Sequence, residues 1–293
     1  MEQPRVHRPH SLPFIKEQIH RLIDDNEQTT ISGFKNADRL FAIGDPNTAH
    51  YVIREYPPYA DVPAQEARAH RQKMYQFTEK LLDELNTKYH IAVPKHTALI
   101  GQGTNTKEAL HIIVERISGK RILDFNGAEI TEHLSEIVTV YQAILKKAKD
   151  VLDNGGPFLD DLTPKQFLYG RPEKDTGAPL RMYFVDLDPS LRIYRADDET
   201  SVDIEVPAIY GMARQIRAVL DTVLTFEERC KDEALFASVL VEAEPIVRKL
   251  LGLLMAPPYR DDPRQKDYVE VLNLYLELCT AYKEQFTEEH SGQ

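Results

Sequence analysis

Four aspartates in two nearby stretches are the residues best suited to chemistry. Asp160 and Asp161 lie in LDDLTPKQFLYG, and Asp186 and Asp188 end the apolar run in RMYFVDLDP. Like charges held close together cost free energy unless a cation or protonation relieves them. If the two stretches fold against each other, we expect a hard divalent ion with oxygen ligands between them. Mg²⁺ is the natural choice, and it usually arrives with phosphates attached.

The two stretches resemble the catalytic core of the protein-kinase-like phosphotransferases, the superfamily that includes aminoglycoside and choline kinases. The catalytic loop of that family reads D-L-x-P-x-N, and a hairpin then leads to a metal-binding aspartate. The resemblance implies that Asp161 is the catalytic residue and that Asp186 binds the metal, helped by Gln166 or Asp188. Gln166 stands where the family has Asn, and D-L-D replaces D-F-G.

Each stretch also has a plain structural interpretation. Thr163 could be the N-cap of a helix that has Pro164 in its first turn, with Gln166 closing a capping box. The residues 186–189 could form a simple turn after a strand. The kinase-like hypothesis therefore depends on the pairing of the two stretches, which occur in the expected order and at the expected separation.

The N-terminal part predicts three short strands, at 29–34, 39–45 and 50–56. In the resembled family the first two strands carry a glycine-rich loop over the phosphates, and the third supplies a lysine. Here Gly33 is the single candidate for that loop, and Arg54 stands at the lysine position. Arginine can bind a phosphate through two hydrogen bonds. The alternative is that Arg54 is an exposed residue on an edge strand.

The next predicted elements are a long helix and two more strands. The helix begins at Pro63 and carries Glu66, which by resemblance would pair with the cation of the third strand; Glu79 is a second candidate. The apolar run EALHIIVE resembles the family's fifth strand and hinge. By resemblance, adenine would lie against the backbone of Glu115 and Ile117.

The C-terminal part is predicted to be largely helical. Amphipathic periodicity indicates helices at 128–153, 207–225, 227–254 and 264–287. A hairpin tip is predicted at 171–179. No A-P-E motif follows Asp188, and the short segment 195–205 leaves little room for a platform that seats a polypeptide, which favours a small-molecule acceptor.

Composition excludes some partners. The chain of 293 residues has 47 acidic against 36 basic residues, a formal charge of −11, so we expect neither nucleic acid nor an anionic membrane surface as a partner. The first ten residues lack the apolar region of a signal peptide, and the two cysteines suggest no disulfide framework. A cytoplasmic location is expected.

The sequence thus predicts an α+β protein with a two-lobed, protein-kinase-like fold. A small antiparallel β-sheet forms the N-lobe at 28–117, after an N-terminal extension and helix at 1–27. A mainly helical C-lobe follows at 118–293. The expected function is ATP- and Mg²⁺-dependent phosphoryl transfer to a small molecule. Two alternatives stay open. One is a catalytically degenerate pseudokinase that binds nucleotide or a protein partner as a scaffold, and the other is an unrelated α+β protein.

Overall fold

The computed structural model describes residues 39–42, 51–56, 72, 76, 79–102, 108–159, 161–186, 191–194 and 208–291. They form a mixed α+β structure with small antiparallel sheets, in two compact units that fall within 32–211 and 212–293. The predicted helix near the N-terminus and the predicted strand at 29–34 lie outside the described residues. The division at 27 and 117 stays a prediction.

A four-stranded antiparallel sheet contains β1 (Arg39–Ala42), β2 (Tyr51–Tyr56), β3 (His96–Gln102) and β4 (Glu108–Glu115). Its strand order is β1-β2-β4-β3. The predicted strands at 39–45 and 50–56 are therefore confirmed where the structure describes them, and the sheet is the small antiparallel one that the sequence favours.

Two helices follow, α3 (Gly127–Glu132) and α4 (Leu134–Asn154). A capping box between Asn126 and Glu129 starts α3, because each side chain accepts a hydrogen bond from the other residue's backbone N–H. One continuous helix was predicted here, but the chain breaks at His133. The His133 ring lies 4.1 Å from the ring of Tyr169, measured between centroids, so a tertiary contact accompanies the break.

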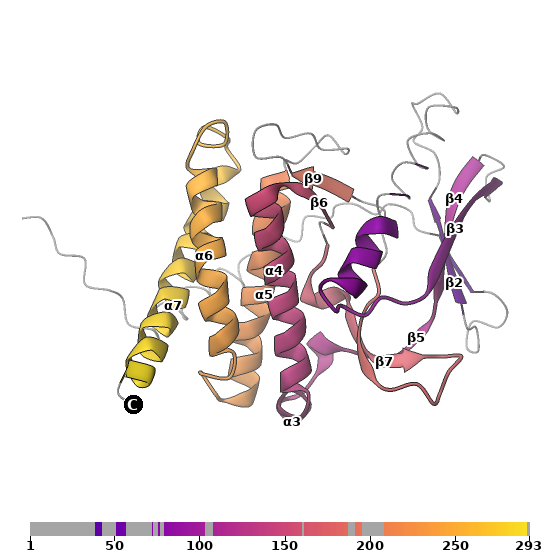
Figure 1. Cartoon of the computed structure of the whole chain (residues 1–293), viewed down its shortest axis with the longest axis horizontal. Helices are drawn as coiled ribbons and strands as arrows, with labels where there is room; N and C mark the ends of the chain where they lie inside the picture. The colour runs from indigo at the N-terminus through magenta and orange to yellow at the C-terminus, as the bar shows by residue number, and fades with distance from the viewer. Residues whose placement is uncertain are drawn as a thin grey trace, which may run out of the picture. The chain divides into compact units, whose positions relative to one another are not determined.

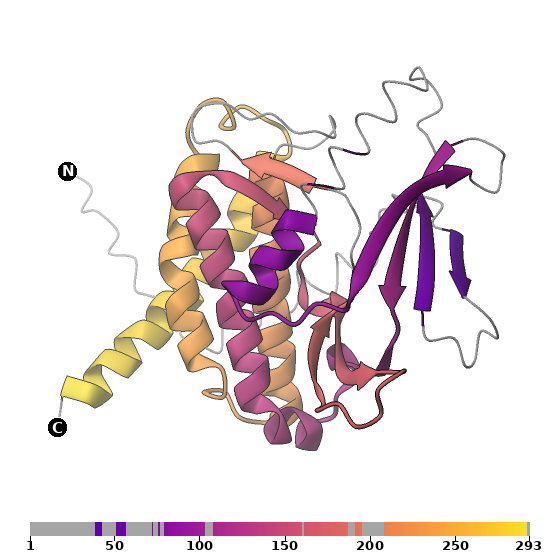
Figure 2. The ribbon, with the colours of Figure 1, turned by 45° about the vertical axis from the view of Figure 1, so that its right-hand side comes forward.

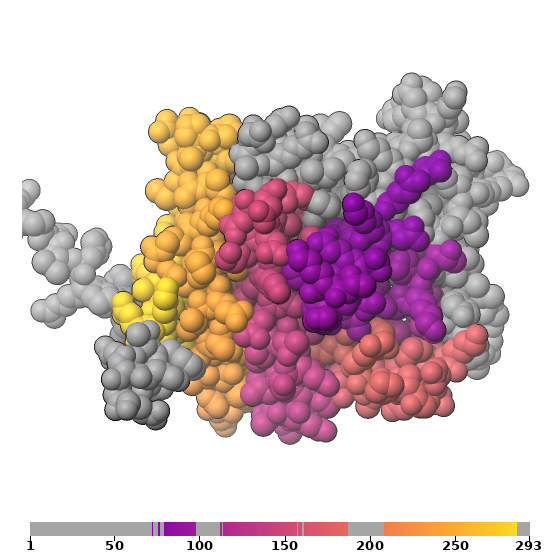
Figure 3. Space-filling model, viewed as in Figure 1, coloured from indigo at the N-terminus to yellow at the C-terminus, as the bar shows by residue number. Residues whose placement is uncertain are grey.

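A helix of residues 79–87 lies between the four-stranded sheet and α4 in both ribbon views (Figures 1 and 2). Leu81, Leu82 and Leu85 are buried, at a spacing that places them on one side of the helix. The space-filling view shows the atoms of this helix and the segment after it directly against α4 (Figure 3).

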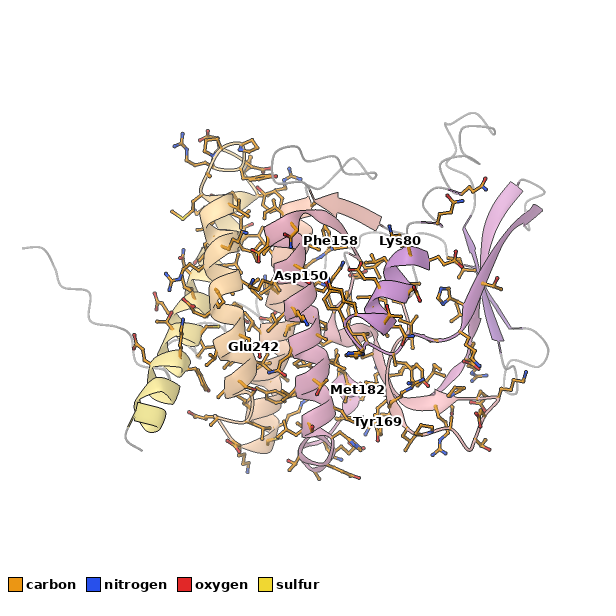
Figure 4. All side chains as sticks on the ribbon, viewed as in Figure 1. Lys80, Asp150, Phe158, Tyr169, Met182 and Glu242 are labelled. Carbon is orange, nitrogen blue, oxygen red and sulfur yellow. The ribbon has the colours of Figure 1, made fainter. Side chains whose placement is uncertain are left out.

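A second antiparallel sheet has the order β5-β7-β8, from β5 (Ile117–Arg121), β7 (Phe167–Pro172) and β8 (Arg181–Phe184). The predicted hairpin is confirmed, with its tip between β7 and β8. Tyr169 and Met182, both labelled in Figure 4, are partners across this hairpin. A third pairing joins β6 (Gly156–Leu159) to β9 (Leu191–Tyr194).

The second unit contains most of α5 (Ala208–Cys230), together with α6 (Ala237–Leu254) and α7 (Gln265–Ser291). The predicted boundary between two helices at 225–227 is wrong, because α5 continues to Cys230 and α6 begins at Ala237. Lys231 then takes a left-handed conformation (φ 54°), and Asp232 N–H donates back to the Glu227 carbonyl, as in a Schellman motif. No described helix is long and apolar enough to cross a membrane.

Glu244 on α6 is a buried carboxylate that links this helix to α7. Its side chain is buried, and it accepts hydrogen bonds from Arg248 Nε (2.8 Å) and Lys283 Nζ (3.1 Å). Burial alone would raise the pKa of Glu244, but the bonds from Arg248 and Lys283 outweigh it and lower that pKa. A carboxyl group whose pKa is lowered by folding contributes its full stabilisation at any pH above its pKa in the unfolded chain. That stabilisation is lost as the pH falls through its pKa in the folded protein.

We therefore expect Glu244→Gln to reduce the free energy of unfolding at neutral pH by about 1–3 kcal/mol and to flatten its acid dependence. Urea unfolding measured at several pH values checks this. Glu242→Gln, an exposed position on the same helix (Figure 4), is the control. Equal acid dependence in wild type and Glu244→Gln would contradict the assignment.

Candidate functional site

The β7–β8 hairpin brings the two acidic stretches to the same end. Phe167 is the partner of Phe184, and one step beyond, Val185 N–H donates to the Gln166 carbonyl (3.0 Å). Asp186 follows Val185 directly. The backbone of Gln166 and the residue before Asp186 are therefore in contact, at the open end of the hairpin.

A compact turn connects Asp161 to that point. Thr163 N–H donates to the Asp161 carbonyl (2.7 Å), and Gln166 N–H donates to the Thr163 carbonyl (3.0 Å) within the 3₁₀ turn Pro164–Gln166. Together with the bond from Val185 to Gln166, these make three successive backbone hydrogen bonds from Asp161 to the residue before Asp186. Main-chain hydrogen bonds thus hold the two stretches together.

The capping-box interpretation of the first stretch is wrong. Thr163 is the N-cap of the 3₁₀ turn, but its side chain makes no capping bond. It is 3% exposed, and its hydroxyl has no hydrogen-bond partner in the described part of the chain. The turn is therefore stabilised by Pro164 and backbone bonds, and the Gln166 side chain forms no capping bond either.

The Asp161 side chain is 40% exposed and lies 3.4 Å from Lys165, measured from Oδ1 to Nζ. An ion pair this exposed contributes little to stability. The ion pair between Asp161 and Lys165 was not predicted from the sequence, although the i,i+4 spacing of the two residues could have indicated it. Asp186 is half-buried, and Asp188 lies outside the described residues.

Arg54 lies in the middle of its sheet. It is in β2, which pairs with β1 on one side and β4 on the other, and its partners there are Leu40 and Ile112. The alternative that placed Arg54 on an edge strand is therefore wrong. Gly33 and Glu66, the other predicted phosphate-site residues, lie outside the described residues.

The segment from Glu115 to Ile117 joins the two larger sheets of the first unit. Glu115 and Ile117 are both buried, and Glu115 N–H donates to the Lys95 carbonyl (2.8 Å). Glu173 N–H donates to the Arg116 carbonyl (2.8 Å), one step before the pairing of Ile117 with Pro172. Bonded and non-bonded pairs alternate along an antiparallel ladder. Ile117 is therefore in a non-bonded pair, and its N–H and C=O point away from β7.

The same alternation places Gly119 in a non-bonded pair with Gly170. Since β5 is an outer strand of its sheet among the described residues, the backbone groups of Ile117 and Gly119 lie along an unpaired edge. Such an edge offers donors and acceptors at fixed spacing to a planar ligand. The sequence pointed to Ile117, and the pairing with β7 adds Gly119.

A surface pocket of about 560 Å³ lies elsewhere in the first unit, lined by the 79–87 helix and residues 93–96. Among its lining residues is Glu79, the second candidate for the glutamate that would pair with Arg54, and no other lining residue is a predicted site residue. Among the described residues, no three side chains of His, Cys, Asp or Glu are grouped as a metal site. Of the three predicted metal ligands, Asp186 and Gln166 are among the described residues.

No family model matches the chain. No curated protein is similar to it either. Among solved structures it is similar to the chain described as "WaaP in complex with acyl carrier protein", with a TM-score of 0.34 and 13% sequence identity over 89% of this chain and 92% of that chain. A TM-score this low does not establish a shared fold. Functional inference therefore rests on the chain's own residues and contacts.

Proposed function

We propose that the chain is a two-lobed, kinase-like phosphotransferase that transfers a phosphoryl group from ATP to a small molecule with the help of Mg²⁺. The observation that carries this is the run of three backbone hydrogen bonds that joins Asp161 to the residue before Asp186. It supports the pairing of the two acidic stretches on which the sequence hypothesis depends. The order along the chain also fits, with strands, a helix, further strands, the hinge, a second helical region, the turn and the hairpin.

Asp161 would orient the acceptor hydroxyl and accept its proton, since its carboxylate is partly exposed at a turn held by the main chain. Asp186 would bind Mg²⁺, and Gln166 or Asp188 would assist. All these ligands are oxygens, which suits a hard cation. Bound Mg²⁺ would neutralise the charge of the phosphates, as it does in phosphoryl transfer generally.

The nucleotide base would bind along the outer edge of β5. The N–H and C=O of Ile117 point from this edge, and the buried Glu115 precedes it. Arg54, in a strand with neighbours on both sides, would bind phosphate oxygens. Gly33 and Glu66, which lie outside the described residues, would have supporting roles there. A cytoplasmic location remains part of the proposal.

The second candidate is a pseudokinase that binds nucleotide or a protein partner without chemistry. Lys165 favours it, because an ammonium group 3.4 Å from the Asp161 carboxylate competes with the acceptor hydroxyl for that oxygen. Gln166 and the D-L-D sequence also depart from the catalytic pattern.

Thermal unfolding with ATP separates these candidates. A ligand that binds only the native state stabilises it, by about 2.7 kcal/mol at 100 times its Kd. We expect millimolar ATP to raise the midpoint temperature by several degrees with Mg²⁺, and by much less with EDTA. A shift that is the same with and without Mg²⁺, and no ADP formation with any hydroxyl acceptor, would favour the pseudokinase. No shift at all would contradict nucleotide binding.

A further inference from the structure

A cluster of charged and aromatic side chains joins the end of the 79–87 helix to α4. Lys147 on α4 is 5% exposed, and its Nζ lies 3.0 Å from Glu84 Oε2. Tyr89 donates its hydroxyl hydrogen to Asp150 Oδ2 (2.7 Å), and Lys88 Nζ lies 3.0 Å from the same oxygen. Asp150 is labelled on α4 in Figure 4.

The cluster takes the Lys147 ammonium group out of water, which costs free energy. Burial lowers the pKa of Lys147, which the bond to Glu84 opposes. Burial also raises the pKa of Tyr89 to about 12, so the phenol keeps the proton that it donates to Asp150. Breaking a buried ion pair by removing one partner is more costly than its net contribution suggests. The cluster is therefore better suited to fixing a position than to adding stability.

The position that the cluster fixes is that of the segment after the helix. His90 takes a left-handed conformation (φ 57°), and Ile91 N–H donates back to the Leu85 carbonyl (2.9 Å). The next residue, Ala92, is buried, and its carbonyl accepts a hydrogen bond from Phe184 N–H (2.9 Å). A parallel bridge also pairs Ala92 with Tyr183.

Strand β8 is thus held on both sides just before Asp186. On one side Phe184 pairs with Phe167 of β7, and on the other it is bonded to Ala92. Ala92, which is bonded to Phe184, is three positions after Tyr89 of the cluster, and Asp186 is two positions after Phe184. A shift of the segment 89–92 along α4 would therefore move the end of β8.

We infer that Lys147 is a positioning residue: through Glu84 and the segment 89–92 it fixes the end of β8 and so the place of Asp186. The consequence for metal binding rests on the proposed function, whereas the consequence for β8 does not. No residue of the cluster needs to touch nucleotide or acceptor for this role.

The test compares Lys147→Met with Lys149→Met. Both lysines are on α4 and both form an ion pair, but the pair of Lys149 with Asp153 (2.6 Å) lies within α4 and is exposed. Methionine keeps the length and apolar stem of lysine. Amide hydrogen exchange at Phe184 and Val185 should rise about tenfold in Lys147→Met relative to the α4 amides, and stay at the wild-type rate in Lys149→Met.

The second readout is the Mg²⁺ concentration that half-saturates ATP binding, which should rise in Lys147→Met alone. Tyr89→Phe removes the hydroxyl that bonds to Asp150 and keeps the Lys147–Glu84 pair. This variant should show the same two changes, and it replaces Lys147→Met in the test if that variant does not fold. Unchanged exchange at Phe184 would overturn the inference, as would increased exchange with an unchanged Mg²⁺ requirement. If wild type binds no ATP, the proposed function fails while exchange at Phe184 and Val185 still decides the role of Lys147.

Discussion

Replacing Asp186 by alanine is expected to abolish the Mg²⁺-dependent part of ATP binding. Asp186 follows the residue whose N–H is bonded to the Gln166 carbonyl, so it is fixed at the open end of the hairpin. Loss of a group that merely orients a metal ligand costs about 10- to 100-fold, so loss of a ligand itself should cost at least that much. Titration calorimetry with a non-hydrolysable ATP analogue, with and without Mg²⁺, measures the effect.

Asp161→Asn should separate binding from chemistry. The amide cannot accept the acceptor's proton, so turnover should fall by about 10²- to 10⁴-fold while Mg²⁺–ATP binding is kept. Asp186→Ala should therefore lose Mg²⁺–ATP binding and turnover with it, whereas Asp161→Asn should lose turnover alone. A phosphotransfer assay and calorimetry on the same preparations reveal the difference.

Asp175→Ala is the matched control for both. It removes one carboxylate from the exposed tip of the same hairpin, at the end remote from Asp186. Binding and turnover should match wild type. If Asp186→Ala binds Mg²⁺–ATP as tightly as Asp175→Ala, Asp186 is not a metal ligand and the proposed site is wrong.

The hairpin that carries this site was predictable because local signals agree there. The apolar residues that begin β7 and the apolar run of β8 flank a segment rich in turn-forming residues, and the register then follows from the turn. The break of α3 from α4 at His133 was not predictable. No breaker residue marks it, and the contact of His133 with Tyr169 becomes visible only in three dimensions.

Lys147 shows a second limit of sequence patterns. A lysine is normally assigned to the solvated face of an amphipathic helix, and it is almost never fully buried unless paired. Its position three residues after Ile144 and four before Val151 places it on the buried face of α4, which was the available signal. The partner, Glu84, is 63 residues away in the chain, and no local pattern indicates it.

The close contact of β5 and β7 supports a strong prediction about stability. Gly119 and Gly170 are opposite each other, and neither has room for a side chain. A Cβ on Gly119 would lie 2.3 Å from the Tyr169 carbonyl oxygen, and one on Gly170 would lie 2.1 Å from the Ser118 carbonyl oxygen. Because the obstacles are backbone atoms, rotation of a side chain cannot relieve the clash. The two strands would have to separate.

We expect Gly119→Ala or Gly170→Ala to lower the free energy of unfolding by about 3 kcal/mol, the upper part of the usual range for overpacking. Urea denaturation measures this. Gly252→Ala is the control, because nothing lies within 4 Å of its Cβ and alanine favours a helix by about 1 kcal/mol over glycine, so that variant should gain stability. If Gly119→Ala is as stable as wild type, then β5 and β7 do not approach so closely. The outward direction of the Ile117 backbone groups, inferred from the same register, would then lose its support.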